Sequence, residues 1–93
     1  MKNKNKENNS GRLFIGDSVI INTEAYLSIA APTCESTIGK IGVVIGFYSD
    51  AESISLTDRK TLIKVFIPDV VYPYHSRWWW NVTNFDITKI EDK

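Results

Sequence analysis

The chain has one cysteine and one histidine, the two side chains first considered for covalent catalysis. Cys34 and His75 lie far apart in the sequence, so a nucleophile and its base would require two separate segments to converge. Glu35 directly follows Cys34, and its negative charge has the wrong sign to stabilise a thiolate. We therefore expect no enzyme, and a Cys34-dependent activity is the least favoured of three interpretations.

No other pattern predicts a catalytic residue, a metal site or a cofactor. The sequence has no pair of histidines, no Cys-x-x-Cys and no carboxylate cluster with the spacing of metal ligands. The segment Gly39-Lys40-Ile41-Gly42 is too short to cradle a phosphate, and it enters an apolar, strand-like run instead of a helix.

Aromatic residues near the end of the chain are the stronger functional signal. Trp78, Trp79 and Trp80 are adjacent, so in a strand either Trp79 packs inside and its neighbours point outward, or the reverse. Exposed aromatic side chains beside an arginine are typical of binding hot spots. In the other interpretation, the connections at 23–38 and 70–77 cover the rings. The predicted partner-binding residues are Tyr26, Tyr72, Tyr74, Arg77, Trp78 and Trp80.

Size and composition predict one small globular domain. The chain has 93 residues, of which 43% are hydrophobic and 24% are charged. No apolar run reaches the length of a membrane span, and no secretory signal is expected. A single cysteine cannot form an internal disulfide, which favours the cytoplasm or an equivalent reducing compartment.

Charge is unevenly distributed, although the formal net charge is zero. Residues 1–11 are polar and basic, and we expect them to form a disordered tail ahead of a domain at 12–93. Four of the 11 basic residues but only one of the 11 acidic residues lie in the first dozen positions. The domain is therefore mildly acidic, which counts against a phosphate-binding face.

The domain is predicted to be all-β, with five short strands centred on the apolar run from Gly39 to Phe47. Val43, Ile45 and Phe47 are expected to share one face, and Gly46 to mark a bulge or a close backbone approach. The predicted strand regions are 12–22, 41–48, 61–67, 77–82 and 87–90, with a one-turn break at 83–86.

The strand at 61–67 shows clear alternation. Ile63, Val65 and Ile67 are expected on one face, and Leu62, Lys64 and Phe66 on the other.

Several motifs resemble those of SH3-like small β-barrels. Gly39-Lys40-Ile41-Gly42-Val43-Val44 is similar to the glycine-bounded turn of KOW-type domains. The segment 81–85 resembles the Asn-x-x-Asn-aromatic turn of E-type photosystem I subunits. Gly16-Asp17-Ser18-Val19 is similar to the start of the variable chain of ferredoxin–thioredoxin reductase, and Tyr26-Leu27 to SipA-type barrels. These motifs are short and shared, so they do not select one member.

The resemblance implies a five-stranded barrel with two long loops that binds proteins or nucleic acids. The leading hypothesis is a non-enzymatic protein-interaction module, acting as an accessory or regulatory subunit. The alternative is a KOW-like domain for RNA or single-stranded DNA, in which Lys40, Lys64, Arg77 and the basic tail hold phosphates. Exposed strand edges also leave a homodimer open.

Overall fold

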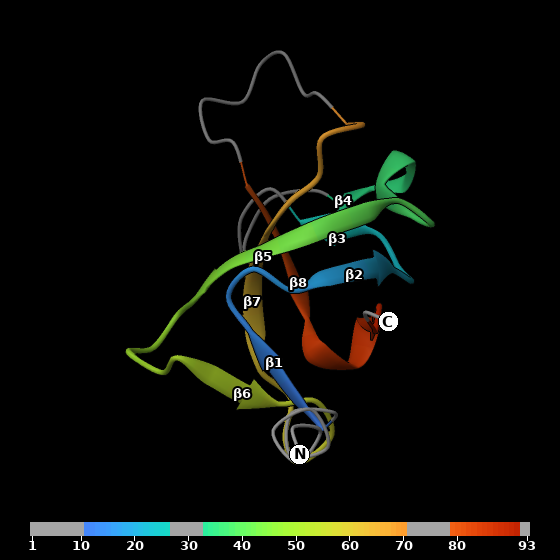
Figure 1. Cartoon of the computed structure of the whole chain (residues 1–93). Coiled ribbons are helices and arrows are strands. Elements are labelled where there is room, and N and C mark those ends of the chain that lie inside the picture. Colours follow the sequence, from blue (N-terminus) through green and yellow to red (C-terminus); the bar gives the residue numbers. More distant parts are fainter. Residues whose placement is uncertain (1–10, 27–32, 71–78, 92–93) are drawn as a thin grey trace.

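The computed structural model describes residues 11–26, 33–70 and 79–91, which form mainly antiparallel strands (Figure 1). This confirms the prediction of an all-β fold. The elements in chain order are β1 (Arg12–Phe14), β2 (Ser18–Ile21), β3 (Ala25–Tyr26), β4 (Thr33–Cys34), η1 (Glu35–Thr37), β5 (Ile41–Phe47), β6 (Ser53–Ser55), β7 (Leu62–Phe66), β8 (Trp80–Thr83), η2 (Asn84–Asp86) and β9 (Ile87–Lys89). Within these ranges, no helix is long and apolar enough to cross a membrane.

Seven strands form one sheet in the order β4-β3-β8-β7-β5-β2-β9, and β1 pairs with β6 separately. In Figure 1, β2 and β5 run across the view, whereas β7 runs down it. The short strands β3 and β4 lie in the connection predicted at 23–38, and β6 lies between the strands predicted at 41–48 and 61–67. Among the described residues no pairing joins β4 to β9, so closure into an SH3-like barrel stays a prediction. The predicted tail is outside the described residues except for Gly11.

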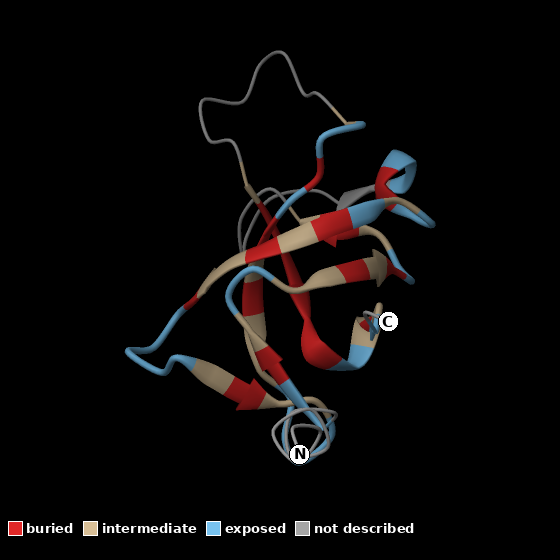
Figure 2. Cartoon of the chain, viewed as in Figure 1, coloured by how far each residue is buried: buried red, intermediate tan, exposed pale blue. Residues whose placement is uncertain are grey.

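The core lies between the inward faces of these strands (Figure 2). On β7 and just beyond it, Ile63, Val65 and Ile67 are each at most 1% exposed, which confirms the predicted alternation. The remaining buried hydrophobic residues are Leu13, Val19, Ile21, Ala25, Val44, Phe47, Ile54, Trp80, Val82 and Ile87.

A bulge in β5 changes which residues face this core. The register against β7 shifts between Val44 and Gly46, so the bulge predicted from Gly46 is confirmed. The extra residue reverses the alternation, and Phe47 turns inward with Val44. The prediction that Phe47 shares a face with Val43 and Ile45 is therefore wrong.

Of the two glycines in β5, Gly42 is the one in close contact with a neighbouring strand. A Cβ atom there would lie 3.2 Å from the carbonyl oxygen of Phe66 and 3.3 Å from Cγ1 of Ile67. At Gly46 the nearest atom would be Cδ of the flexible Lys64 side chain, at 3.8 Å.

We expect Gly42→Ala to lower the free energy of unfolding by about 1–3 kcal/mol, because a neighbouring strand would have to move. Gly46→Ala is the matched control, with an expected change of less than about 1 kcal/mol. Urea unfolding measures both. Equal effects of the two substitutions would contradict this assignment of the tight contact.

The predicted one-turn break is confirmed as η2, and its first residue holds a neighbouring loop. Asn84 is 2% exposed, and its Oδ1 accepts a hydrogen bond from the backbone N–H of Thr61 at 2.7 Å. Its Nδ2 lies 2.8–3.2 Å from the carbonyl oxygens of Ser55, Leu56 and Arg59. One amide side chain thus fixes the whole turn from β6 to β7.

Asn84→Ala should lower the free energy of unfolding by about 2–3 kcal/mol, because these backbone groups would lose a buried partner. Asn22→Ala is the control. Asn22 is exposed and its side chain hydrogen-bonds to Thr88, so its loss should cost less than about 1 kcal/mol. Thermal or urea unfolding of the two variants distinguishes them, and a similarly small effect at Asn84 would refute this role.

Candidate functional site: an aromatic sheet face

The face of the sheet that points away from the core has a row of paired residues across four strands. Gly46 on β5 pairs with Lys64 on β7, Lys64 pairs with Asn81 on β8, and Asn81 pairs with Tyr26 on β3. These positions alternate with buried residues such as Ile63 and Val65, so their side chains lie on the outer face.

Lys64 lies between two aromatic rings in this row. Its Nζ is 4.7 Å from the ring centroid of Tyr48 and 5.2 Å from a ring centroid of Trp79. Both distances are within the range of cation–π attraction. Gly46, opposite Lys64, has no side chain and leaves room for the lysine stem.

Asn81 links the same cluster to the edge of the sheet. Its side chain is fully buried, with 0% exposure, in the middle of β8. The Tyr48 hydroxyl donates a hydrogen bond to Asn81 Oδ1, and Asn81 Nδ2 donates to the carbonyl oxygen of Tyr26 at 3.3 Å. One amide therefore orients Tyr48 and joins β3 to the central strands.

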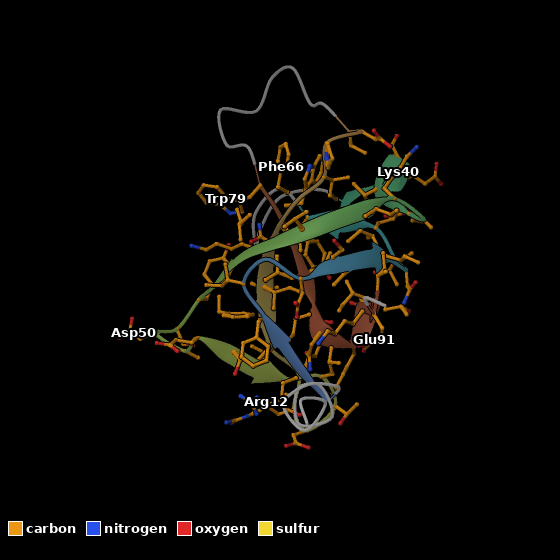
Figure 3. All side chains as sticks on the ribbon, in the orientation of Figure 1. Arg12, Lys40, Asp50, Phe66, Trp79 and Glu91 are labelled. Atoms are coloured by element: carbon orange, nitrogen blue, oxygen red, sulfur yellow. The ribbon has the colours of Figure 1, made fainter. Side chains whose placement is uncertain are left out.

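The second row of the outer face is apolar. Val43 pairs with Phe66, and continuing the β7–β8 register by one residue places Phe66 opposite Trp79. In Figure 3, Phe66 and Trp79 lie close together at the same end of the molecule. Tyr48 is 47% exposed and Phe66 is 38% exposed, while Trp79 is half-buried. We call Val43, Tyr48, Lys64, Phe66 and Trp79 the outer aromatic face.

The structure describes two of the six predicted partner-binding residues. Tyr26 is half-buried beside Asn81, at the edge of the outer aromatic face. Trp80 is 4% exposed and pairs with the core residue Val65, so the prediction that it contributes an exposed ring is wrong. Of the two arrangements considered for the tryptophan run, the structure has the one in which Trp80 packs inside and Trp79 does not. The other four, Tyr72, Tyr74, Arg77 and Trp78, lie outside the described residues.

The sequence did not predict that Tyr48, Lys64, Phe66 and Trp79 form a single surface. Alternation did place Lys64 and Phe66 on the face opposite the core, so these two could have been identified as surface residues. Tyr48 could not be assigned in this way because the bulge lies between it and the start of β5.

The described residues contain no group of three His, Cys, Asp or Glu side chains that could hold a metal ion. The backbone of Cys34 pairs with Ala25 in β4 and β3, but His75 lies outside the described residues. The Cys34–His75 hypothesis therefore stays a prediction. What the outer aromatic face offers chemically is a set of ring surfaces, methyl groups and one ammonium group.

Tyr48→Phe should lower the free energy of unfolding by about 1–2 kcal/mol, because the buried Asn81 amide loses a partner. Tyr26→Phe is the control, since the Tyr26 hydroxyl makes no hydrogen bond within the described residues and its loss should be nearly neutral. Urea unfolding provides the comparison. Equal stability of Tyr48→Phe and the wild type would show that this bond does not contribute to the fold.

No match to the chain was found among protein-family models, curated proteins or solved structures.

Proposed function

We propose that this chain is a non-enzymatic protein-interaction module, an accessory or regulatory subunit that binds its partner through the outer aromatic face. The observation that carries the proposal is the exposure of Tyr48 and Phe66, at 47% and 38%, beside the half-buried Trp79. Large aromatic side chains clustered on a surface are the residues that dominate protein-binding energies.

The contacts within the cluster support the same proposal. Tyr48 is held by Asn81 and lies against Lys64, and Phe66 belongs to a central strand. Side chains that are already ordered lose little conformational entropy on binding, which favours affinity.

Nucleic-acid binding is the alternative, since bases stack on aromatic rings beside cations. Lys64 is the single charged residue in the sequences of β5, β7 and β8. Affinity for a phosphate backbone requires several cations, so the composition of this face favours a protein partner.

The SH3-like frame is part of the proposal. It is supported by the neighbouring order β9-β2-β5-β7-β8 and by the single turn η2 ahead of β9. A reducing compartment such as the cytoplasm is also proposed, from the single cysteine.

Phe66→Ala should reduce partner capture from nuclease-treated cell extract by about tenfold, because it removes a central ring of the contact surface. Phe85→Ala is the matched control: Phe85 is 53% exposed in η2, beyond the opposite end of β8 from Trp79, and its loss should leave capture unchanged. Circular dichroism verifies that both variants fold. Undiminished capture by Phe66→Ala, or equal losses in both variants, would reject the proposal.

A further inference from the structure

We propose that the outer aromatic face binds an extended acidic segment of a partner protein, with a carboxylate on Lys64 and a neighbouring apolar side chain on Phe66 and Val43. This inference rests on the proposed function and specifies the chemistry of the partner.

The charge on the face determines the sign of the partner. Neither Asp nor Glu occurs in the sequences of β5, β7 and β8, and Lys64 is their single charged residue. The salt bridge found among the described residues joins Asp17 to Lys89 on the edge strand β9, away from β7. Lys64 instead contacts the faces of two aromatic rings. Ring faces attract the ammonium group but are poor acceptors for its three N–H donors. A carboxylate supplies those acceptors together with the opposite charge.

The lysine is also well placed to act as a specific contact. It is half-buried, its stem lies in the space above Gly46, and its Nζ is positioned between the Tyr48 and Trp79 rings. An ion pair formed in such a partly desolvated position is worth more than one on an open surface.

The spacing of the two rows determines the form of the partner. Lys64 and Phe66 are two residues apart on β7, so their side chains leave the same face about 7 Å apart. An extended peptide presents its residues i and i+2 on one side at the same interval. A segment with an acidic residue two positions from a Leu, Ile, Phe or Trp therefore matches Lys64 and the Phe66–Val43 pair together.

The same charge disfavours a second copy of this chain as the occupant. A two-fold axis that passes near Lys64 would bring each Lys64 close to its symmetry mate, and like charges at an interface are unfavourable. An acidic partner avoids this repulsion.

The test is selection from a phage-displayed random-peptide library on the full-length protein, followed by fluorescence anisotropy with the enriched peptides. We expect the enriched sequences to have Asp or Glu two positions from a large apolar residue. Lys64→Gln should raise their Kd about tenfold, because it removes the charge while keeping an unbranched side chain that can still donate hydrogen bonds. Lys64→Arg should preserve binding, and Lys60→Gln, at an exposed lysine in the β6–β7 turn, should have no effect. Selection on Lys64→Glu should enrich basic peptides instead.

The outcomes separate the two proposals. Peptides whose binding is lost in Phe66→Ala, but which lack acidic residues or tolerate Lys64→Gln, would overturn this inference and leave the proposed function intact. A selection that yields no Phe66-dependent peptide would count against both. Dimerisation in analytical ultracentrifugation that Phe66→Ala abolishes would assign the face to a second copy. Salt-sensitive binding of labelled oligouridine that depends on Phe66 would assign it to a nucleic acid. Either result would overturn the acidic-peptide proposal.

Discussion

Strand β8 is buried on both faces, and the rest of the described structure depends on how its polar side chains are satisfied there. All four of its residues, Trp80 to Thr83, are buried, although two of them are polar. Buried amides and hydroxyls are tolerated only where they find hydrogen-bond partners. Asn81 finds Tyr48 and the backbone of Tyr26, and Asn84 in the next turn finds the backbone between β6 and β7. Two amides three residues apart, one within β8 and one just after it, thus connect this strand to its surroundings.

The outer aromatic face is a consequence of this arrangement combined with the bulge at Gly46. Without the extra residue, Tyr48 would continue the inward alternation and would not reach the Asn81 amide. With it, Phe47 fills the core while Tyr48 lies over Lys64. Gly46, just after the extra residue, has no side chain, and the stem of Lys64 lies over it. A local irregularity in one strand therefore determines the composition of a surface formed by three strands.

Residue alternation was sufficient to predict some of these features but not others. The faces of β7 followed directly from Ile63, Val65 and Ile67, and glycine chemistry indicated where β5 bulges. The phase of the tryptophan run was missed, because three identical residues carry no alternation; Val82, which shares a face with Trp80 and is 1% exposed, held the signal, and the register with Val65 agrees with it. Strands of two or three residues, such as β3, β4 and β6, are too short to show a period. Their pairing depends on partners distant in the sequence, as between Leu13 and Ile54.

The same limit applies to the candidate site. Lys64 and Phe66 could be assigned to the outer face from sequence, but their proximity to Tyr48 and Trp79 depends on register and on the bulge. The hydrogen bonds of Asn81 and Asn84 join segments up to 55 positions apart, and no local pattern encodes them. Sequence-based interpretation therefore predicted an exposed ring at Trp80, which is buried, whereas the neighbouring Trp79 is half-buried on the outer face.

The position of β2 in the sheet bears on the order in which the chain can fold. β2 lies between β5 and β9, so one of its two neighbours comes from much later in the chain. Lys89 on β9 also binds the carbonyl oxygen of Arg12, 77 positions earlier, and forms a salt bridge with Asp17. During synthesis, the early strands emerge first and must wait for β9 with one edge of β2 open. Contacts of such long sequence separation are slow to form, so the sheet reaches its final arrangement only after residue 89 has left the ribosome.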